Sequence, residues 1–259
     1  MSRSENLSGA ERQGRVSRLV EQRRRVSVAE ICDMFGVSVA TARRDLDALA
    51  DAGRVQRVHG GAILAQPAPP EGPVLERAME QGDQKRRIGE VAAALIEPHD
   101  AVFVGSGTTS LEVARNLPLD YELTVVTNSL LALNVLAERQ DITLICLGGS
   151  LRHSEGSMIG HIAEQALKEL RLHKVFLGVR ALDVDAGLTN DYLPEAMTDR
   201  QILGAGRQVI LLADHTKCGR VSTGFLAPLS RVHTLITDTS TPEEFLTRVR
   251  GLGVQVLVV

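Results

Sequence analysis

Apolar residues recur at helical spacing in three successive segments near the start of the chain, at residues 10–24, 28–35 and 38–49. Spacings of three and four place such positions on one side of an α-helix, where they can be buried together. Only Gly36 and Val37 separate the second segment from the third, and Ser38 is a favourable N-cap. The pattern predicts three helices, the last two forming a helix-turn-helix. The side chains expected to face inward are Val16, Leu19, Val20, Ile31, Met34, Phe35, Ala42, Leu46 and Leu49.

The third predicted helix carries two adjacent arginines away from its apolar face. Thr41, Arg44, Asp45 and Ala48 are expected on its other faces. Arg43 and Arg44 are set about 100° apart around the helix axis, so at most one of them can point squarely at base edges in a DNA groove. On a lone amphipathic helix, such a pair is also compatible with two solvated side chains.

The residues that follow the third helix favour DNA binding. Residues 55–63 form a short hairpin-like segment that includes Arg57, and three helices followed by a basic wing are typical of a winged helix-turn-helix. Arg44, on the same face as Thr41, is predicted to contact bases, and Arg43 to contact phosphate. The residues predicted to form the DNA interface are Ser38, Thr41, Arg43, Arg44, Arg57 and His59.

Charge is divided unevenly along the chain. The formal net charge of the 259 residues is −3, but residues 1–64 hold 11 Lys and Arg against 8 Asp and Glu, whereas the remainder holds 18 against 24. A basic head on an acidic body concentrates the attraction for DNA phosphates in one place. The length and the 44% content of hydrophobic residues predict two domains with a sizeable core.

The sequence favours a cytoplasmic protein without metal or cofactor. No stretch approaches the ~18 apolar residues of a membrane span, and residues 1–6 lack the apolar core of a signal peptide. Cys32, Cys146 and Cys218 are odd in number and far apart, which predicts neither a disulfide framework nor a zinc site. Cys32 and Cys146 are expected in the core, and Cys218 is expected to be an unreactive surface thiol, a reactive one being the alternative. The histidines show no metal spacing.

The second part of the chain is predicted to form an open α/β sheet. Residues 65–73 contain four prolines and a glycine, which predicts a linker between a domain at 1–64 and another at 74–259. Continuous apolar runs, typical of parallel strands covered on both faces, then alternate with helical segments. Strands are expected at 101–104, 123–127, 142–147, 174–178, 208–213, 234–237 and 254–259, and helices at 83–97, 110–116, 130–140, 161–172, 194–203 and 242–250.

Several loops that follow these strands are rich in glycine, hydroxyl and charged residues. In open α/β sheets ligands bind beyond the carboxyl ends of the strands. The loop at 105–110 leads into a helix, where backbone N–H groups and the helix N-terminus could hold a phosphate, although tight turns select the same residues for structural reasons. Arg152 and Lys217 are natural charge partners for such a phosphate. The residues predicted to bind an effector are Ser106, Gly107, Thr108, Thr109, Thr127, Asn128, Ser129, Gly148, Gly149, Arg152, Glu195 and Lys217.

The motifs in both halves resemble those of the DeoR family of bacterial transcriptional regulators. Residues 37–46 match the Val-Ser-x-x-Thr-x-Arg-Arg-Asp-Leu pattern, and residues 57–62 match Arg-x-His-Gly-Gly-Ala. The resemblance implies an oligomeric repressor that leaves its operator when a phosphorylated sugar or related metabolite binds a domain similar to ribose-5-phosphate isomerase. The matches in the second half are Lys85-Arg86, 107–109, 127–129, 147–149, 176–178, Gly187-Leu188, Glu195-Ala196 and Asp214-x-x-Lys217.

Two positions depart from the family pattern. Gly105 stands where an Asp is common, and Asp199 stands where a Lys is common, which changes the local charge by two units. The effector is therefore expected to be less anionic than a typical sugar phosphate, or to be held differently.

Two further classes of protein are alternatives to the repressor. A sugar-phosphate isomerase could use Glu195, Asp183, Asp185 or Asp199 as base with Lys217 polarising the substrate, but it has no use for residues 10–64. A purely architectural protein accounts neither for the polar loops nor for the linker. The expected partners are double-stranded operator DNA, a small phosphorylated metabolite and further copies of the chain.

Overall fold

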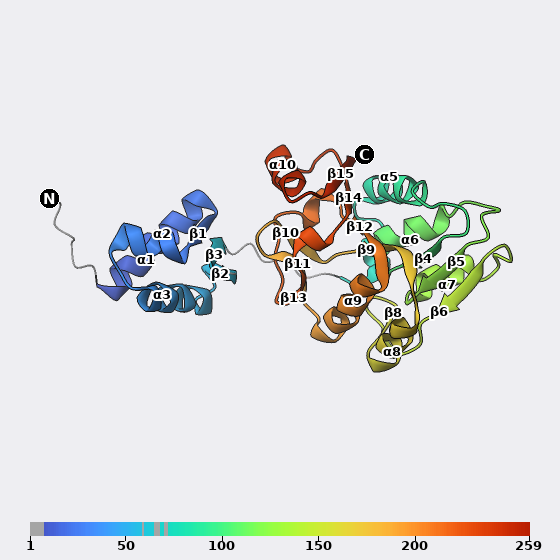
Figure 1. Ribbon diagram of the computed structural model, residues 1–259, viewed down its shortest axis with the longest axis horizontal. Coiled ribbons are helices and arrows are strands. Elements are labelled where there is room, and N and C mark those ends of the chain that lie inside the picture. Colours follow the sequence, from blue (N-terminus) through green and yellow to red (C-terminus); the bar gives the residue numbers. More distant parts are fainter. Residues whose placement is uncertain (1–7, 59, 65–67, 70–71) are drawn as a thin grey trace. The chain divides into compact units, whose positions relative to one another are not determined.

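The computed structural model describes residues 8–58, 60–64, 68–69 and 72–259. The chain divides into two compact units, Met1–Pro67 and Ala68–Val259, which are described separately (Figure 1). Of the predicted linker, residues 65–67, 70 and 71 lie outside the described part of the chain, and so does His59.

The first unit is a winged helix-turn-helix, as the apolar pattern predicts. Serines begin its helices: Ser8 and Ser27 each form a reciprocal capping box with the glutamate three residues later, and Ser38 caps the third helix. A small antiparallel sheet of order β1-β3-β2 completes it. Its elements are α1 (Gly9–Arg23), β1 (Arg25–Ser27), α2 (Val28–Phe35), α3 (Val39–Asp51), β2 (Val55–Val58) and β3 (Gly61–Leu64).

Two side chains of this unit lie elsewhere than the helical pattern predicts. Met34 is 48% exposed rather than inward, because the core of this small unit is already closed by Ile31 and its neighbours. Asp45 is buried rather than on an outer face, since its carboxylate pairs with Arg12 and accepts from Gln13 Nε2 at 3.1 Å. The ion pair raises the pKa of the Arg12 guanidinium, mainly through its hydrogen bond to Asp45. A salt bridge thus fastens α1 to α3.

The second unit is built on a parallel sheet of order β15-β14-β12-β9-β4-β5-β6, which confirms the predicted open α/β sheet. From β4 the chain runs outward through β5 and β6, and it then returns to the other side of β4 to add β9, β12, β14 and β15. The strand order therefore reverses between β4 and β9. The strands are β4 (Ala101–Val104), β5 (Thr124–Thr127), β6 (Thr143–Cys146), β9 (Leu172–Gly178), β12 (Gly206–Leu212), β14 (Thr234–Thr237) and β15 (Gln255–Val258).

Helices cover both faces of this sheet (Figure 1). Alternate residues of one strand enter different cores: Val102 and Val104 pack with α5, α6 and α7, whereas Phe103 packs with the side of α8, α9 and α10. Helices α5, α7 and α8 end earlier than predicted. The helices are α4 (Val74–Arg77), α5 (Gly82–Ala93), α6 (Thr108–Arg115), α7 (Leu130–Leu136), α8 (His161–Glu169), α9 (Leu193–Ala205) and α10 (Glu243–Gly251).

Short antiparallel strands, which the apolar runs did not predict, extend the second unit. Each has only three or four residues, which is too short to stand out as a hydrophobic segment. They form a β7–β8 pair and a separate sheet of order β10-β11-β13. Their bounds are β7 (Ser150–Arg152), β8 (Ser157–Ile159), β10 (Ala181–Asp183), β11 (Gly187–Asn190) and β13 (Gly224–Ala227).

The cysteines differ in part from expectation. Cys146 is exposed rather than buried, because β6 is an edge strand of the sheet. Cys218 is partly buried, not a surface thiol, and burial raises its pKa to about 12, which argues against a reactive thiolate.

Across the described residues, no helix combines the length and apolarity required to cross a bilayer.

Candidate functional site

The first candidate site is the exposed side of α3. Ser38 Oγ accepts from the Thr41 backbone N–H at 3.2 Å, and its hydroxyl lies 3.0 Å from Thr41 Oγ1. These two predicted DNA contacts therefore hold the start of the helix together. Arg43 and Arg44 are both exposed, and neither side chain has a hydrogen bond or ion pair with another described residue. Both guanidinium groups are available to a DNA duplex.

Arg57 plays a different part from the arginines of α3. It lies on β2, where its Nη1 donates to the Gly61 carbonyl at 2.8 Å and its Nε lies 2.9 Å from an Asp47 carboxylate oxygen. It thus links the wing to α3 while remaining about one-third exposed. His59, the other predicted wing contact, lies outside the described residues.

The second candidate site is a cavity of about 340 Å³ in the second unit. Residues that follow β4, β9 and β12 line it, and these three strands are neighbours in the sheet. The cavity therefore lies at the carboxyl ends of the central strands, where the strand order reverses between β4 and β9. Such a switch point is where open α/β sheets bind ligands.

The loop between β4 and α6 forms one wall of the cavity. Ser106, Gly107, Thr108 and Thr109 all line it, so the structure brings these four predicted effector contacts together. Gly107 is the N-cap of α6 with φ of +96°, a conformation that favours glycine. It has no side chain to cap the helix, so the first-turn N–H groups of α6 are suited to a bound anion.

The absence of an aspartate at position 105 has a steric reason. A Cβ at Gly105 would lie 2.9 Å from Leu177 Cδ1 and 3.3 Å from the Phe176 carbonyl oxygen. The Gly105 N–H also donates to that carbonyl. The close approach of β9 therefore leaves no space for a larger residue unless Leu177 moves.

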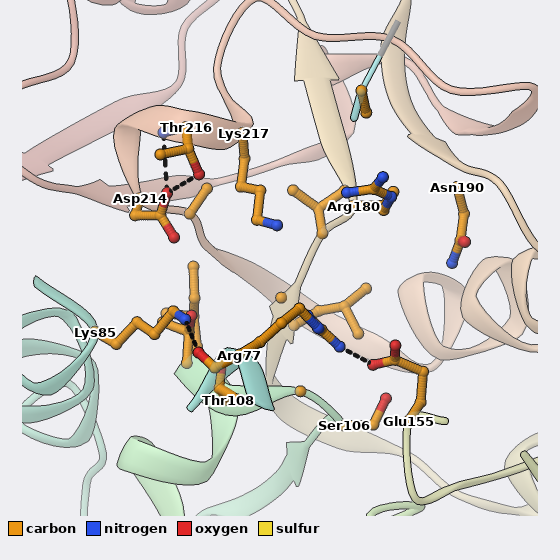
Figure 2. Close-up of a pocket in the computed structure, with 18 of the residues that line it drawn as sticks. Arg77, Lys85, Ser106, Thr108, Glu155, Arg180, Asn190, Asp214, Thr216 and Lys217 are labelled. Carbon is orange, nitrogen blue, oxygen red and sulfur yellow. Dashed lines mark hydrogen bonds and ion pairs between the residues drawn. The ribbon is translucent and has the colours of Figure 1, made fainter. Parts of the chain in front are cut away.

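Two lysines face the α6 end of the cavity. Lys217 follows β12 and extends toward the middle of the cavity, while Lys85 enters from the first turn of α5 (Figure 2). Lys85 Nζ donates to the Arg77 carbonyl at 2.7 Å. Burial lowers the pKa of Lys85, with the Asp214 carboxylate opposing this effect and the Lys217 charge adding to it. A ligand anion would relieve the repulsion between these two ammonium groups.

Arg152 and Glu195 also line the cavity, but they are bound to each other. Ser157 Oγ donates to the other Glu195 carboxylate oxygen at 2.6 Å, and the Arg152 guanidinium lies over the Tyr192 ring, 4.4 Å from its centroid. Arg152 is therefore paired with Glu195 at the cavity wall, and its role as a phosphate partner stays a prediction.

Charged side chains hold described residues that precede α5 at the edge of the cavity. Arg77 pairs with Glu155, and its Nε donates to the Gly72 carbonyl at 3.0 Å. Arg180 donates to the Pro69 carbonyl and pairs with Asp191 at 2.9 Å. Arg77, Glu155, Arg180 and Asp191 thus form a wall of the cavity together with Pro69 and Gly72.

Five predicted effector contacts lie outside the lining of this cavity. Thr127 ends β5 and donates to the Val104 carbonyl, and Ser129 follows the strand and caps α7. Asn128 Nδ2 donates to the Met158 carbonyl at 3.3 Å. Gly148 and Gly149 follow β6, beyond β5 from the switch point. The structure therefore does not bring these five residues into the cavity lining, and their role as effector contacts stays a prediction.

The sequence analysis missed several residues that line the cavity. Lys85 belongs to the Lys85-Arg86 motif, but it lies on helix α5, and the sequence analysis expected ligand contacts in the loops that follow strands. Asp214 lies three positions before Lys217, and its Oδ1 accepts from the Thr216 N–H at 2.9 Å. The polar lining residues that were not among the predicted effector contacts are Arg77, Glu80, Gln81, Lys85, Glu155, Arg180, Asn190, Asp191, Asp199, Asp214 and Thr216. Most of them come from turns and short strands that only the fold brings together.

Comparison with known proteins assigns both units to one family. A DeoR-like helix-turn-helix domain matches residues 12–68, and a DeoR C terminal sensor domain matches residues 80–239. The chain is 34% identical over 236 residues to the glycerol-3-phosphate regulon repressor of Escherichia coli K12, covering 91% of this chain and 93% of the relative. It is 30% identical over 252 residues to a putative aga operon transcriptional repressor of Escherichia coli O157:H7, covering 96% and 94%.

Solved structures with a related arrangement are more distant. The full-length sorbitol operon regulator SorC from Klebsiella pneumoniae matches 94% of this chain and 100% of its own, with 14% identity and a TM-score of 0.38. A ribose 5-phosphate isomerase from Methanocaldococcus jannaschii matches 54% of this chain and 55% of its own, with 14% identity and a TM-score of 0.39. Similarity at this level supports no inference about activity.

The winged helix-turn-helix and the sensor domain together define a DNA-binding transcriptional regulator and not an enzyme. The chain belongs to the DeoR family, as its motifs indicated.

Proposed function

We propose that this regulator is a repressor of carbohydrate metabolism genes, and that a phosphorylated sugar or related metabolite releases it from its operator. Two relatives of similar length are named as repressors, one of a glycerol-3-phosphate regulon and one of an aga operon. The protein is proposed to act in the cytoplasm, with residues 65–73 serving as a linker between a DNA-binding domain at 1–64 and a sensor domain at 74–259.

The observation that carries the proposed effector class is the cavity at the switch point. The α6 N-terminus and the lysines Lys85 and Lys217 meet there, and the partial positive charge of a helix N-terminus adds to the charge of the ammonium groups. A phosphate is the group of a metabolite best matched to this wall. We assign its binding to Ser106, Gly107, Thr108, Thr109, Lys85 and Lys217.

A ligand screen combined with an operator-release assay tests this function. Sugar phosphates, polyol phosphates and the corresponding free sugars are added to the full-length protein, and thermal unfolding identifies the compounds that bind. A ligand at a hundredfold excess over its Kd stabilises the folded state by about 2.7 kcal/mol. A phosphorylated compound that binds should also release the protein from operator DNA. Release by free sugars alone would contradict the assignment.

Arg44 and Arg43 are expected to differ in their contribution to DNA binding. Arg44→Ala should weaken operator binding by roughly 1–3 kcal/mol and relax the sequence preference, because it removes a base contact. Arg43→Ala should weaken binding to all sequences alike and reduce the salt slope by about 1, because it removes a phosphate contact. Binding measured on operator and unrelated DNA across salt concentrations separates the two effects, and the opposite split would reverse the assignment.

Operator binding is expected to require an oligomer. One small helix-turn-helix reads a short half-site, and a second copy adds a second half-site. A fragment of residues 1–64 should therefore bind the operator far more weakly than the full chain at the same salt concentration. Equal affinities would remove the need for an oligomer. The molar mass of the full chain by light scattering gives the number of copies.

A further inference from the structure

The cavity has two sides of different chemistry. Lys85 and Lys217 lie on one side, and Asn190 lies on the other with Glu155 and Arg180 (Figure 2). Glu195, Asp199 and Asp191 also line the cavity, and the first two bond to Asn190. We call the side formed by Glu155, Asn190, Asp191, Glu195 and Asp199 the acidic side.

The arginines that line the cavity neutralise all but one of the carboxylates on the acidic side. Arg77 pairs with Glu155, Arg152 pairs with Glu195, and Arg180 pairs with Asp191. Among the residues that the structure describes, none places a Lys or Arg nitrogen within ion-pair distance of Asp199. Among the described carboxyl groups of the acidic side, Asp199 is therefore the one without a paired Lys or Arg.

The surroundings of Asp199 make the lack of a paired cation costly. The residue is 8% exposed, and its Oδ2 accepts from Asn190 Nδ2 at 3.2 Å. The same amide nitrogen lies 3.3 Å from Glu195 Oε2, so one donor serves two carboxyl groups. A buried carboxylate beside another carboxylate, without a cation of its own, is unfavourable.

The surroundings of Asp199 consequently favour its protonated form. Burial, and after it the Glu195 carboxylate, raise the pKa of Asp199 well above its ordinary value. The Asn190 hydrogen bond and the Arg152 charge act in the opposite direction, and the Glu155 charge adds to the increase. A cation placed beside Asp199 would make its ionisation favourable.

We propose that the effector brings this cation: it is a phosphorylated amino sugar or amino alcohol whose phosphate binds at Lys85 and Lys217 and whose ammonium group pairs with Asp199. The assignment rests on the proposed function, because it uses the phosphate wall of the same cavity. A ligand that carries only hydroxyl groups leaves Asp199 without a paired cation, whereas an ammonium group supplies one and makes its ionisation favourable.

Matched pairs of compounds test the proposal. We choose D-glucosamine 6-phosphate with D-glucose 6-phosphate, and 2-aminoethyl phosphate with 2-hydroxyethyl phosphate, so that each pair differs in an amino against a hydroxyl group. Calorimetry on the full-length protein at neutral pH should give a roughly 10- to 150-fold higher affinity for at least one amino compound than for its hydroxyl partner. That compound should also release operator DNA at the lower concentration.

The Asp199→Asn variant removes the charge and nearly preserves the shape. It should abolish the preference for the amino compound and leave the affinity for the hydroxyl partner within about twofold. The matched control is Asp83→Asn, at an exposed carboxylate at the start of α5 that is not part of the cavity lining, and it should keep the preference. Operator binding and thermal unfolding of each variant establish that it is folded.

Proton release gives a second measurement that needs no variant. Because its surroundings favour the protonated form of Asp199 in the free protein and an ammonium group favours the ionised form, the amino compound should release up to about one proton more on binding than its hydroxyl partner. The phosphate group contributes equally to both members of a pair. The affinity for the amino compound, relative to the affinity for its hydroxyl partner, should therefore rise with pH until the raised pKa of Asp199 in the free protein is reached. Calorimetry in two buffers of different ionisation enthalpy measures the number of protons.

The possible outcomes separate this proposal from the proposed function. Equal affinities within both pairs, or an amino preference that survives in Asp199→Asn, would overturn the role of Asp199 and leave the phosphate wall intact. If neither inorganic phosphate nor any of the four compounds binds the wild type, the phosphate wall itself is wrong, and the proposal for Asp199 fails with it.

Discussion

The Lys217→Ala variant should bind the operator like the wild type and yet require roughly 10- to 150-fold more effector to leave it. The substitution removes a charge-assisted hydrogen bond to the ligand phosphate, for which about 1.5–3 kcal/mol is expected in a poorly solvated site. Operator binding should persist because the helix-turn-helix is a separate compact unit. A ligand shifts the DNA-binding equilibrium only by its difference in affinity for the two states, so weaker ligand binding directly weakens the response.

Release of labelled operator DNA, titrated with a phosphorylated compound that binds the wild type, measures this effect. Lys168→Ala is the matched control: it removes an exposed lysine of α8 that does not line the cavity, and it should release operator at the wild-type ligand concentration. If Lys217→Ala also releases at that concentration, the effector binds somewhere else. Turnover of the compound at enzymatic rates would contradict the assignment of the chain as a regulator.

The helix-turn-helix could be predicted because its signals are local. Helical spacing of apolar residues and the serine caps lie within a few residues of each other, and each favours the same structure. The burial of Asp45 could not be found in this way. It depends on Arg12, which lies on a different helix and 33 positions away, and helical periodicity gives no information about such a partner.

The cavity was only partly predictable, since sheet topology decides which strand ends meet. The sequence indicated the loop at Ser106–Thr109 and the later Lys217, and both follow strands next to the switch point. Ser129 and Gly148 follow β5 and β6, which lie on the outer side of β4, so these similar loops do not line the cavity. Continuous apolar runs identify parallel strands but do not give their order.

The two departures from the family pattern have different physical meanings. At Gly105 the backbone of β9 and the Leu177 side chain occupy the space of a side chain, so the position is explained by packing. At Asp199 packing offers no such reason, because a buried carboxyl group lies beside Glu195. A change of charge in a ligand cavity, unlike a change of volume outside it, is expected to alter which ligand binds.

The Asp45→Ala variant should destabilise the helix-turn-helix unit by about 3 kcal/mol, because removing one partner of a buried ion pair leaves the other charge uncompensated. The pair qualifies as buried, since the Arg12 and Asp45 side chains are 14% and 4% exposed. The same carboxylate accepts from Gln13, so a second donor of α1 also loses its acceptor. Hydrogen exchange on the full-length protein should show amide protection in α1 and α3 reduced by roughly 100-fold. Protection in the strands of the second unit should not change.

Asp47→Ala provides the control for this experiment from the same helix. Asp47 pairs with Arg57 at 2.9 Å, but the two side chains are 59% and 32% exposed. Exposed pairs contribute less than about 1 kcal/mol, so protection in α1 and α3 should decrease by no more than about fivefold. Similar losses in both variants would show that burial does not set the strength of the Arg12–Asp45 pair. Full protection in Asp45→Ala would show that the apolar contacts alone hold α1 on α3.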